Sequence, residues 1–191
     1  MTMTDYKSTN YDRANSSLSY SAIGATGRIG FGFLKSPSNW GFHGILDISG
    51  IKVDNKTTTF ASAETNAVHR QTWGRFGEIR NNIGLYYKEL PETVGFASTQ
   101  STSTDLIKFL GPHYGFEYWR ALDSQYGVQA NAHIYLPLMK MKTPNDQALV
   151  MTPSYQVGLL GSYRWQPNIT ALLGYAYRID QIKYKALPGA V

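Results

Sequence analysis

The chain has 191 residues, and its 18 Gly, 14 Tyr and only 16% charged residues are typical of one β-rich domain. It has no Cys, which excludes disulfide bonds, thiolate metal sites and thiol nucleophiles. The net charge of +5 comes from Lys and Arg residues scattered singly, which argues against a nucleic-acid partner. No apolar run approaches the ~18 residues of a membrane helix.

The first patterned stretch is SAIGATGRIGFGF, residues 21–33. Its glycine spacing is similar to that of a dinucleotide-binding loop, but such a loop needs a helix directly after it. The residues that follow, FGFLKSPSNWG, contain Gly, Pro and Ser, which would not form that helix. We therefore predict a β-strand here, with glycines on its crowded inner face.

The first half of the chain continues with weaker alternation. Residues 40–49 and 80–88 alternate apolar or aromatic side chains with polar ones, which is the pattern of a half-buried strand. Residues 57–73, between them, have the least regular pattern. We predict a strand there mainly because the neighbouring strands need a partner.

Alternation is strictest in the second half. In PSYQVGLLGSYRWQ, residues 153–166, the odd positions are apolar with aromatics at both ends, and the even positions are mostly polar or small. Residues 110–120, 126–138 and 169–180 repeat this pattern. About eight strands follow, with the longest connections expected at residues 91–105 and 143–151. The sequence therefore predicts an all-β, antiparallel, up-and-down architecture.

The apolar face of these strands indicates the environment of the sheet. A sheet of this length must close or stack to remove its edges, and a continuous apolar face of this size would be untenable in water. Tyr155 to Trp165 spans about 33 Å at ~3.3 Å per residue, or about 25 Å along the normal at a tilt of roughly 40°. We therefore expect a transmembrane β-barrel with its apolar side toward lipid. A soluble lipocalin-like barrel and a β-sandwich remain alternatives.

The opposite, polar face would line a lumen just wide enough for side chains. Buried charges must pair, so we expect Arg28 to pair with Asp47, and Arg164 or Arg178 to pair with Asp180 or Glu117. The full expected lumen network is Arg28, Asp47, Arg80, Glu117, Arg164, Arg178 and Asp180. The expected lipid-facing and girdle aromatics are Trp40, Phe42, Tyr114, Phe116, Tyr118, Tyr155, Tyr163, Trp165, Tyr175 and Tyr177.

The hairpin YQVGLLGSYRWQPNITALLGYAYR resembles the closing hairpins of small bacterial outer-membrane barrels, the OmpA/OmpX/OmpW-like group. The resemblance is one of pattern and extends over roughly residues 19–184. It implies a Gram-negative outer membrane, with the signal peptide removed, and contact with outer-membrane lipid and lipopolysaccharide. The chain departs from the group by continuing past Tyr184 as KALPGAV. We expect a flexible segment at residues 1–17, the barrel at 18–185, and a tail or linker start at 186–191.

These features favour a structural or surface-interaction membrane protein, with a protein partner at its loops or termini as a further option. A narrow channel for ions or small solutes is the alternative. His43, His113 and His133 fall on the predicted inner faces, and for this reason a lipid-modifying barrel enzyme is kept as a minor third option. No catalytic set is identifiable among the abundant serines. The His spacing is not that of a metal site, and we expect no enzyme activity, metal or cofactor.

Overall fold

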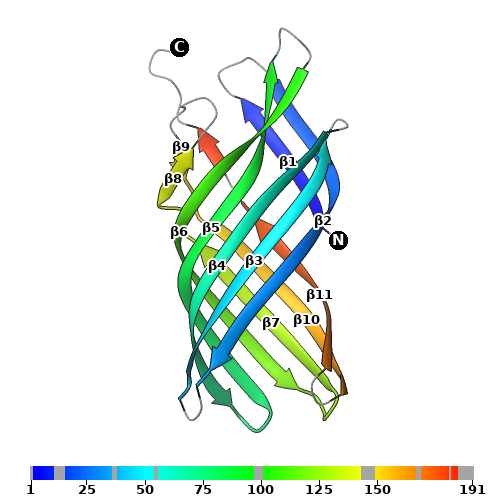
Figure 1. Cartoon of the computed structure of the whole chain (residues 1–191), viewed down its shortest axis with the longest axis vertical. Coiled ribbons are helices and arrows are strands. Elements are labelled where there is room, and N and C mark those ends of the chain that lie inside the picture. The colour runs from blue at the N-terminus through cyan, green and yellow to red at the C-terminus, as the bar shows by residue number, and fades with distance from the viewer. Residues whose placement is uncertain are drawn as a thin grey trace.

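The computed structural model describes residues 2–10, 16–35, 38–53, 56–96, 101–142, 149–166, 169–180 and 182–184. Nearly all of them lie in strands (Figure 1). The strands are β1 (Thr2–Asn10), β2 (Ser16–Leu34), β3 (Trp40–Val53), β4 (Lys56–Trp73), β5 (Gly77–Phe96), β6 (Ser101–Ala121), β7 (Tyr126–Tyr135), β8 (Met139–Lys142), β9 (Leu149–Met151), β10 (Ser154–Gln166), β11 (Ile169–Ile179) and β12 (Ile182–Tyr184). The described residues contain no helix that could span a membrane.

Ten strands form one antiparallel sheet, which curls into the wall of a barrel (Figure 1). Its order is β1-β2-β3-β4-β5-β6-β7-β10-β11, and β8 also pairs with β6. Each strand from β2 onward pairs with the next long strand along the chain, so the topology is up-and-down. The all-β, antiparallel barrel architecture predicted from the alternation is therefore confirmed. The connections β2–β3, β4–β5, β6–β7 and β10–β11 lie at the end shown at the bottom of Figure 1, which we call the lower end.

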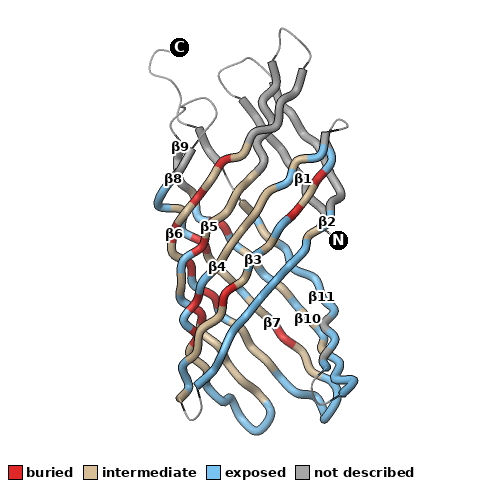
Figure 2. Tube along the Cα trace, in the orientation of Figure 1, coloured by how far each residue is buried: buried red, intermediate tan, exposed pale blue. Residues whose placement is uncertain are grey.

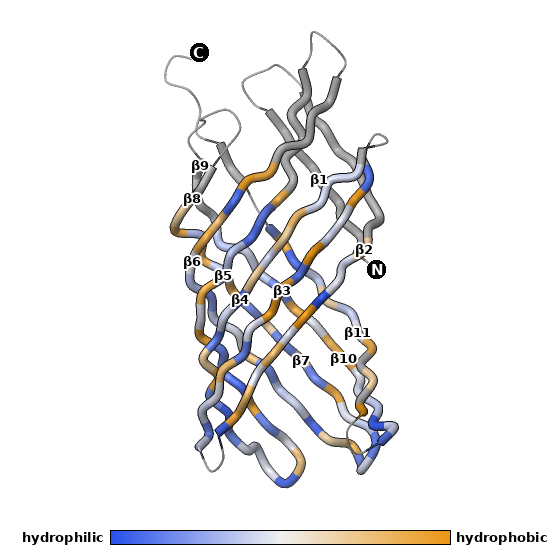
Figure 3. The backbone as a smooth tube through the Cα atoms, viewed as in Figure 1, coloured by the Kyte–Doolittle hydropathy of each residue, from blue (hydrophilic) through white to orange (hydrophobic). Residues whose placement is uncertain are grey.

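Hydrophobic and hydrophilic residues follow one another along the strands (Figure 3), and successive side chains of a strand point to opposite sides of the wall. In β10, the odd residues Tyr155, Val157 and Leu159 are exposed, whereas the preceding Ser154 is buried and the intervening residues are half-buried. Buried apolar side chains from different strands, Tyr86, Ile107, Phe109 and Tyr135, form a cluster inside the barrel. The exposed apolar side chains consequently form the outer wall, and the interior is mixed polar and aromatic.

Three neighbouring strands are interrupted along one line across the sheet. β7 ends at Tyr135, whose ladder partner Ser154 begins β10, and the adjacent strand β11 ends at Ile179. β8 continues the track of β7 along β6, since Leu136 and Leu138 still donate to β6 carbonyls at 3.0 and 3.1 Å. β9 and β12, by contrast, pair with each other and with no other described strand. The ladder of backbone hydrogen bonds that joins β7, β10 and β11 therefore ends at this line.

The sheet ends in two free edges, on β2 and β11. β1 covers the outer edge of β2 only over residues 16–24, and Figure 2 shows the lower half of β2 exposed. Stepping between ladder partners from Phe33 leads across the sheet to Ile179, through Phe42, Ala67, Ile83, Tyr114, Ile134 and Tyr155. If the lower ends of β2 and β11 are set level, with outward-facing residues opposite one another, Phe33 lies opposite Ala171, which corresponds to a stagger of about eight residues from Ile179. An eight-stranded barrel with that stagger has strands tilted by ~36°.

Two expectations about the ends of strands need correction. Residues 91–105 were expected to connect strands, but β5 continues to Phe96 and β6 begins at Ser101, with Pro91 paired to Leu106. The ladder between β4 and β5 ends at Lys88, so Pro91, which lacks an N–H, lies where β5 has lost one neighbour. Within the segment expected to be flexible, residues 2–10 form β1. The expected tail, residues 186–191, lies outside the described residues.

Candidate functional site

The barrel interior is the most densely bonded polar region in the described part of the chain. Its buried polar residues come from six strands: Ser49, Asn66, Asn82, His113, Gln129 and Ser154. Ionisable side chains lie among them in three groups, described in turn below. All of these residues occupy the inner positions of the alternating pattern, because the period of a strand is two.

The first group joins opposite walls of the barrel. Lys88 on β5 bonds to the carboxylate of Asp180, directly after β11, and these strands lie four positions apart in the sheet. Arg178 donates from Nε to the same carboxylate at 3.1 Å, and its guanidinium lies 3.8 Å from the ring centroid of Tyr135. The Lys88 side chain is only 11% exposed and that of Asp180 18%. These side chains therefore meet in the middle of the lumen.

The second group is centred on Glu64 of β4. The hydroxyl of Tyr135 on β7 donates to Glu64 Oε1 at 2.9 Å, and Nε2 of the buried His113 lies 4.0 Å from Oε2. The ring of His113 stacks on Tyr135 with centroids 5.2 Å apart and on His133 at 6.2 Å. This group forms a second bridge across the lumen, since β5 and β6 lie between β4 and β7.

The third group lies nearer the lower end. Glu117 accepts from Asn82 Nδ2 at 2.8 Å and from Trp119 Nε1 at 3.0 Å, while the Arg80 guanidinium lies 4.7 Å from the Trp119 ring. Glycine makes room for the larger side chains of these layers. A Cβ at Gly115 would lie 2.5 Å from Nδ1 of His133, so only glycine leaves space for that ring.

The expected lumen residues are placed as follows. Arg28 donates to both carboxylate oxygens of Asp47, at 2.7 and 2.9 Å, so that predicted pair is confirmed. Arg178 pairs with Asp180, as one of the predicted options had it. Glu117 and Arg80 lie together around Trp119, and Arg80 also bonds to Glu78. Arg164 is exposed, with no ion pair to a carboxylate in the described part of the chain.

The expected outer aromatics lie on the outer wall. Eight are exposed and two, Phe42 and Tyr118, are half-buried. The exposed eight are Trp40, Tyr114, Phe116, Tyr155, Tyr163, Trp165, Tyr175 and Tyr177. All four Trp residues lie near the lower end, at positions 40, 73, 119 and 165. Of these, Trp119 points inward to Glu117.

Sequence reasoning missed the two residues that bridge the lumen from β4 and β5. Glu64 lies in the stretch with the least regular alternation, where Thr and Ala take the outer positions and leave no apolar stripe. Lys88 lies at a polar position of the alternating stretch 80–88, but its partner Asp180 is 92 residues away in the sequence. The available signal was the inner series Glu64, Asn66, Val68 and Arg70 at a period of two.

The interior does not have the arrangement of a metal centre. Among the residues that the structure describes, no group of three or more His, Asp or Glu could hold a metal ion. The rings of His113 and His133 are stacked, with centroids 6.2 Å apart. Comparison with protein families, with curated proteins and with solved structures finds no match to this chain.

Proposed function

We propose that this protein is an integral outer-membrane β-barrel with a lumen closed by side chains, acting as a structural or surface-interaction protein. The observation that carries the proposal is the meeting of Lys88 and Asp180 from opposite walls. A second bridge, from Tyr135 to Glu64, crosses the interior as well. Side chains paired in this way fill the interior of a small barrel, which supports a lumen closed by side chains.

The outer wall supports the membrane location. Exposed apolar side chains cover several strands, with Leu173 84%, Ile29 71% and Tyr175 71% exposed. A contiguous apolar surface of this extent is incompatible with a soluble monomer and suits contact with lipid. The lower end carries exposed Trp40, Trp73 and Trp165, as expected at a membrane–water interface. In this proposal the surrounding partners are outer-membrane lipid and lipopolysaccharide.

A narrow channel is the second candidate, and one observation favours it. Several buried polar atoms in the described part of the chain have no protein hydrogen-bond partner, including both ring nitrogens of His113 and Oδ1 of Asn66, Asn82 and Asn131. Atoms of this kind normally bond to water or ions. A chain of them along the lumen would suit slow passage of water or small ions.

Two measurements test the proposal. Refolding into detergent followed by electrophoresis, with and without heating, should give two mobilities, as expected of a stable membrane barrel. A monodisperse monomer without detergent would overturn the membrane location. Planar bilayers should then show no single-channel steps for the wild type. Regular conductance steps would replace the closed barrel with the channel.

A further inference from the structure

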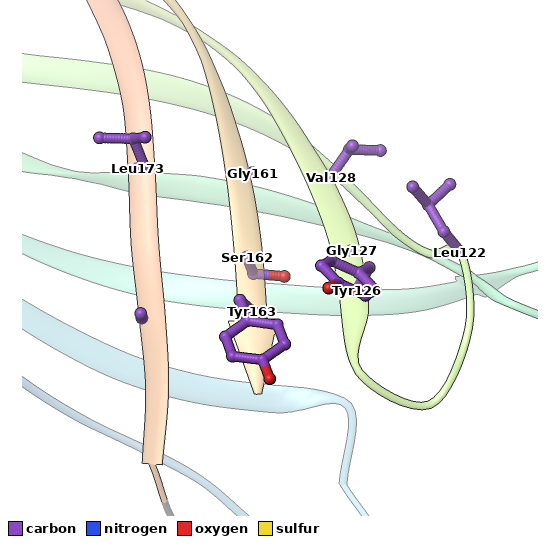
Figure 4. Close-up of a pocket in the computed structure, with 9 residues that line it drawn as sticks. Leu122, Tyr126, Gly127, Val128, Gly161, Ser162, Tyr163 and Leu173 are labelled. Atoms are coloured by element: carbon purple, nitrogen blue, oxygen red, sulfur yellow. The ribbon is translucent and has the colours of Figure 1, made fainter. Parts of the chain in front are cut away.

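The outer wall carries a groove near the lower end, formed by β7, β10 and β11 (Figure 4). Its volume is about 400 Å³, which is within the size range of small-ligand sites. Figure 4 shows Leu173 and Val128 on strands to either side of Gly161, which has no side chain to fill the space between them. The groove is therefore the consequence of one small residue in a row of large ones.

The row across the strands explains the shape. Val128, Gly161 and Leu173 are successive ladder partners on β7, β10 and β11. In the next row toward the turns, Tyr126 and Tyr163 are partners, with ring centroids 5.1 Å apart, and they border the lower side. A Cβ at Gly161 would meet only one backbone oxygen, at 3.7 Å, so the space above this residue is open.

A cation stands at the end of the same row. Arg120 on β6 is the ladder partner of Val128, which places it about 10 Å from Gly161 at two interstrand spacings of ~4.8 Å. Arg120 is exposed, and within the described residues no carboxylate lies at ion-pair distance from it. An apolar groove with an unpaired cation beside it matches an amphiphile that has an acyl chain and an anionic head.

The charge of the lower end supports this match. Its exposed ionisable residues in the described part of the chain are four cations, Lys35, Arg75, Arg120 and Arg164, and one acid, Asp123. The carboxylate of Asp123 accepts hydrogen bonds from the backbone N–H groups of Gln125 and Tyr126 at 2.7 Å, so its charge is partly balanced by the N–H dipoles of its own turn. The lower rim is therefore positive and aromatic, as expected at an anionic lipid surface.

We infer that this groove binds one anionic phospholipid, with an acyl chain over Gly161 and the phosphate at Arg120. The inference rests on the proposed membrane location and adds a specific lipid site to it. A single groove with one adjacent cation fits a single phosphodiester. Lipid A, with several chains and two phosphates, would need a wider groove and clustered cations.

Native mass spectrometry of the detergent-refolded protein tests the site, with phosphatidylglycerol, phosphatidylcholine and lipid A as separate probes. The wild type should retain one phosphatidylglycerol in preference to phosphatidylcholine. Arg120→Gln should weaken retention of phosphatidylglycerol by about fivefold, the effect of one cation at a lipid surface. Gly161→Leu should weaken retention of both phospholipids, because the new side chain fills the groove.

Matched controls are available on the same wall. Lys52 is an exposed cation near the other end, and Gly50 is a glycine whose added Cβ would meet nothing within 4 Å. Lys52→Gln and Gly50→Leu should therefore retain lipid as the wild type does. Equal retention of the two phospholipids by the wild type, preference for lipid A, or equal effects of the Arg120 and Lys52 variants would each overturn the site. Heat-modifiable mobility, measured on the same samples, shows separately whether the barrel itself has formed.

Discussion

Removing the carboxylate at the middle of the lumen should destabilise the barrel far more than removing the lysine that it binds. Asp180 holds two cations, Lys88 and Arg178, and the three side chains are only 11–18% exposed. Asp180→Asn would leave both cations buried together without a counter-charge. Breaking a buried ion pair by removing one partner costs about 3–5 kcal/mol, and we expect a loss of this size in the free energy of unfolding.

Lys88→Met should behave differently. Asp180 keeps its bond to Arg178 at 3.1 Å, so the remaining pair is neutral, and the methionine fills the volume of the lysine stem. No buried charge then loses its only partner, so we expect a clearly smaller loss than for Asp180→Asn.

Urea unfolding of the protein refolded into lipid vesicles measures both effects, with Trp fluorescence as the signal. The four Trp residues are far from the substituted positions, at the lower end, so they report on unfolding of the whole barrel. If Lys88→Met costs as much as Asp180→Asn, the carboxylate is not the centre of the network. The reasoning from net buried charge would then be refuted.

Three further predictions concern the wall, the interior and one turn. The chain has no Cys, so pairs of introduced cysteines report on the closure of the barrel. Phe33→Cys with Ala171→Cys should form a disulfide on mild oxidation, whereas Phe33→Cys with Ile179→Cys should not. The reverse result on non-reducing gels would contradict the stagger of about eight residues. Gly115→Leu should lower the free energy of unfolding by about 1–3 kcal/mol, since the added side chain enters space held by an imidazole ring, and an unchanged urea midpoint would show that the ring moves aside freely. The backbone N–H groups of Tyr126 and Gln125 donate to the carboxylate of Asp123 and hold its pKa below the usual value, so its stabilising effect should be present at neutral pH and disappear as the pH falls through the lowered pKa. Asp123→Ala should therefore lower the urea midpoint at pH 7 but not at a pH below that pKa. An equal loss at both pH values would contradict this prediction.

Local patterns in the sequence predicted most of the wall. Alternation with a period of two assigns each residue of β10 and β11 to a face, because successive side chains in a strand must point in opposite directions. The pair of Arg28 and Asp47 was predictable for the same reason, since a hairpin brings neighbouring strands into register. Short-range geometry was sufficient for both.

Contacts across the lumen could not be predicted in this way. Lys88 and Asp180 are 92 residues apart, and their meeting depends on the curvature of the whole sheet. The extension of β5 and β6 was missed because Pro91 and the Ser/Thr-rich stretch after it are typical of turns. Thr and Val are also good strand formers, and pairing with a long neighbouring strand decides whether such a stretch forms a turn or a strand.

The line of interruptions across β7, β10 and β11 divides the barrel into parts with different mechanics. Below it, the backbone hydrogen bonds run unbroken from β2 to β11, so this part should resist deformation as one continuous sheet. Above it, β9 and β12 form a separate two-stranded sheet, with no ladder to any other strand among the described residues. Because β9 and β12 share no described ladder bond with the main sheet, their amides should exchange with solvent sooner. Asp180 lies between β11 and β12, so its bond to Lys88 connects the start of this two-stranded sheet to β5 on the opposite wall.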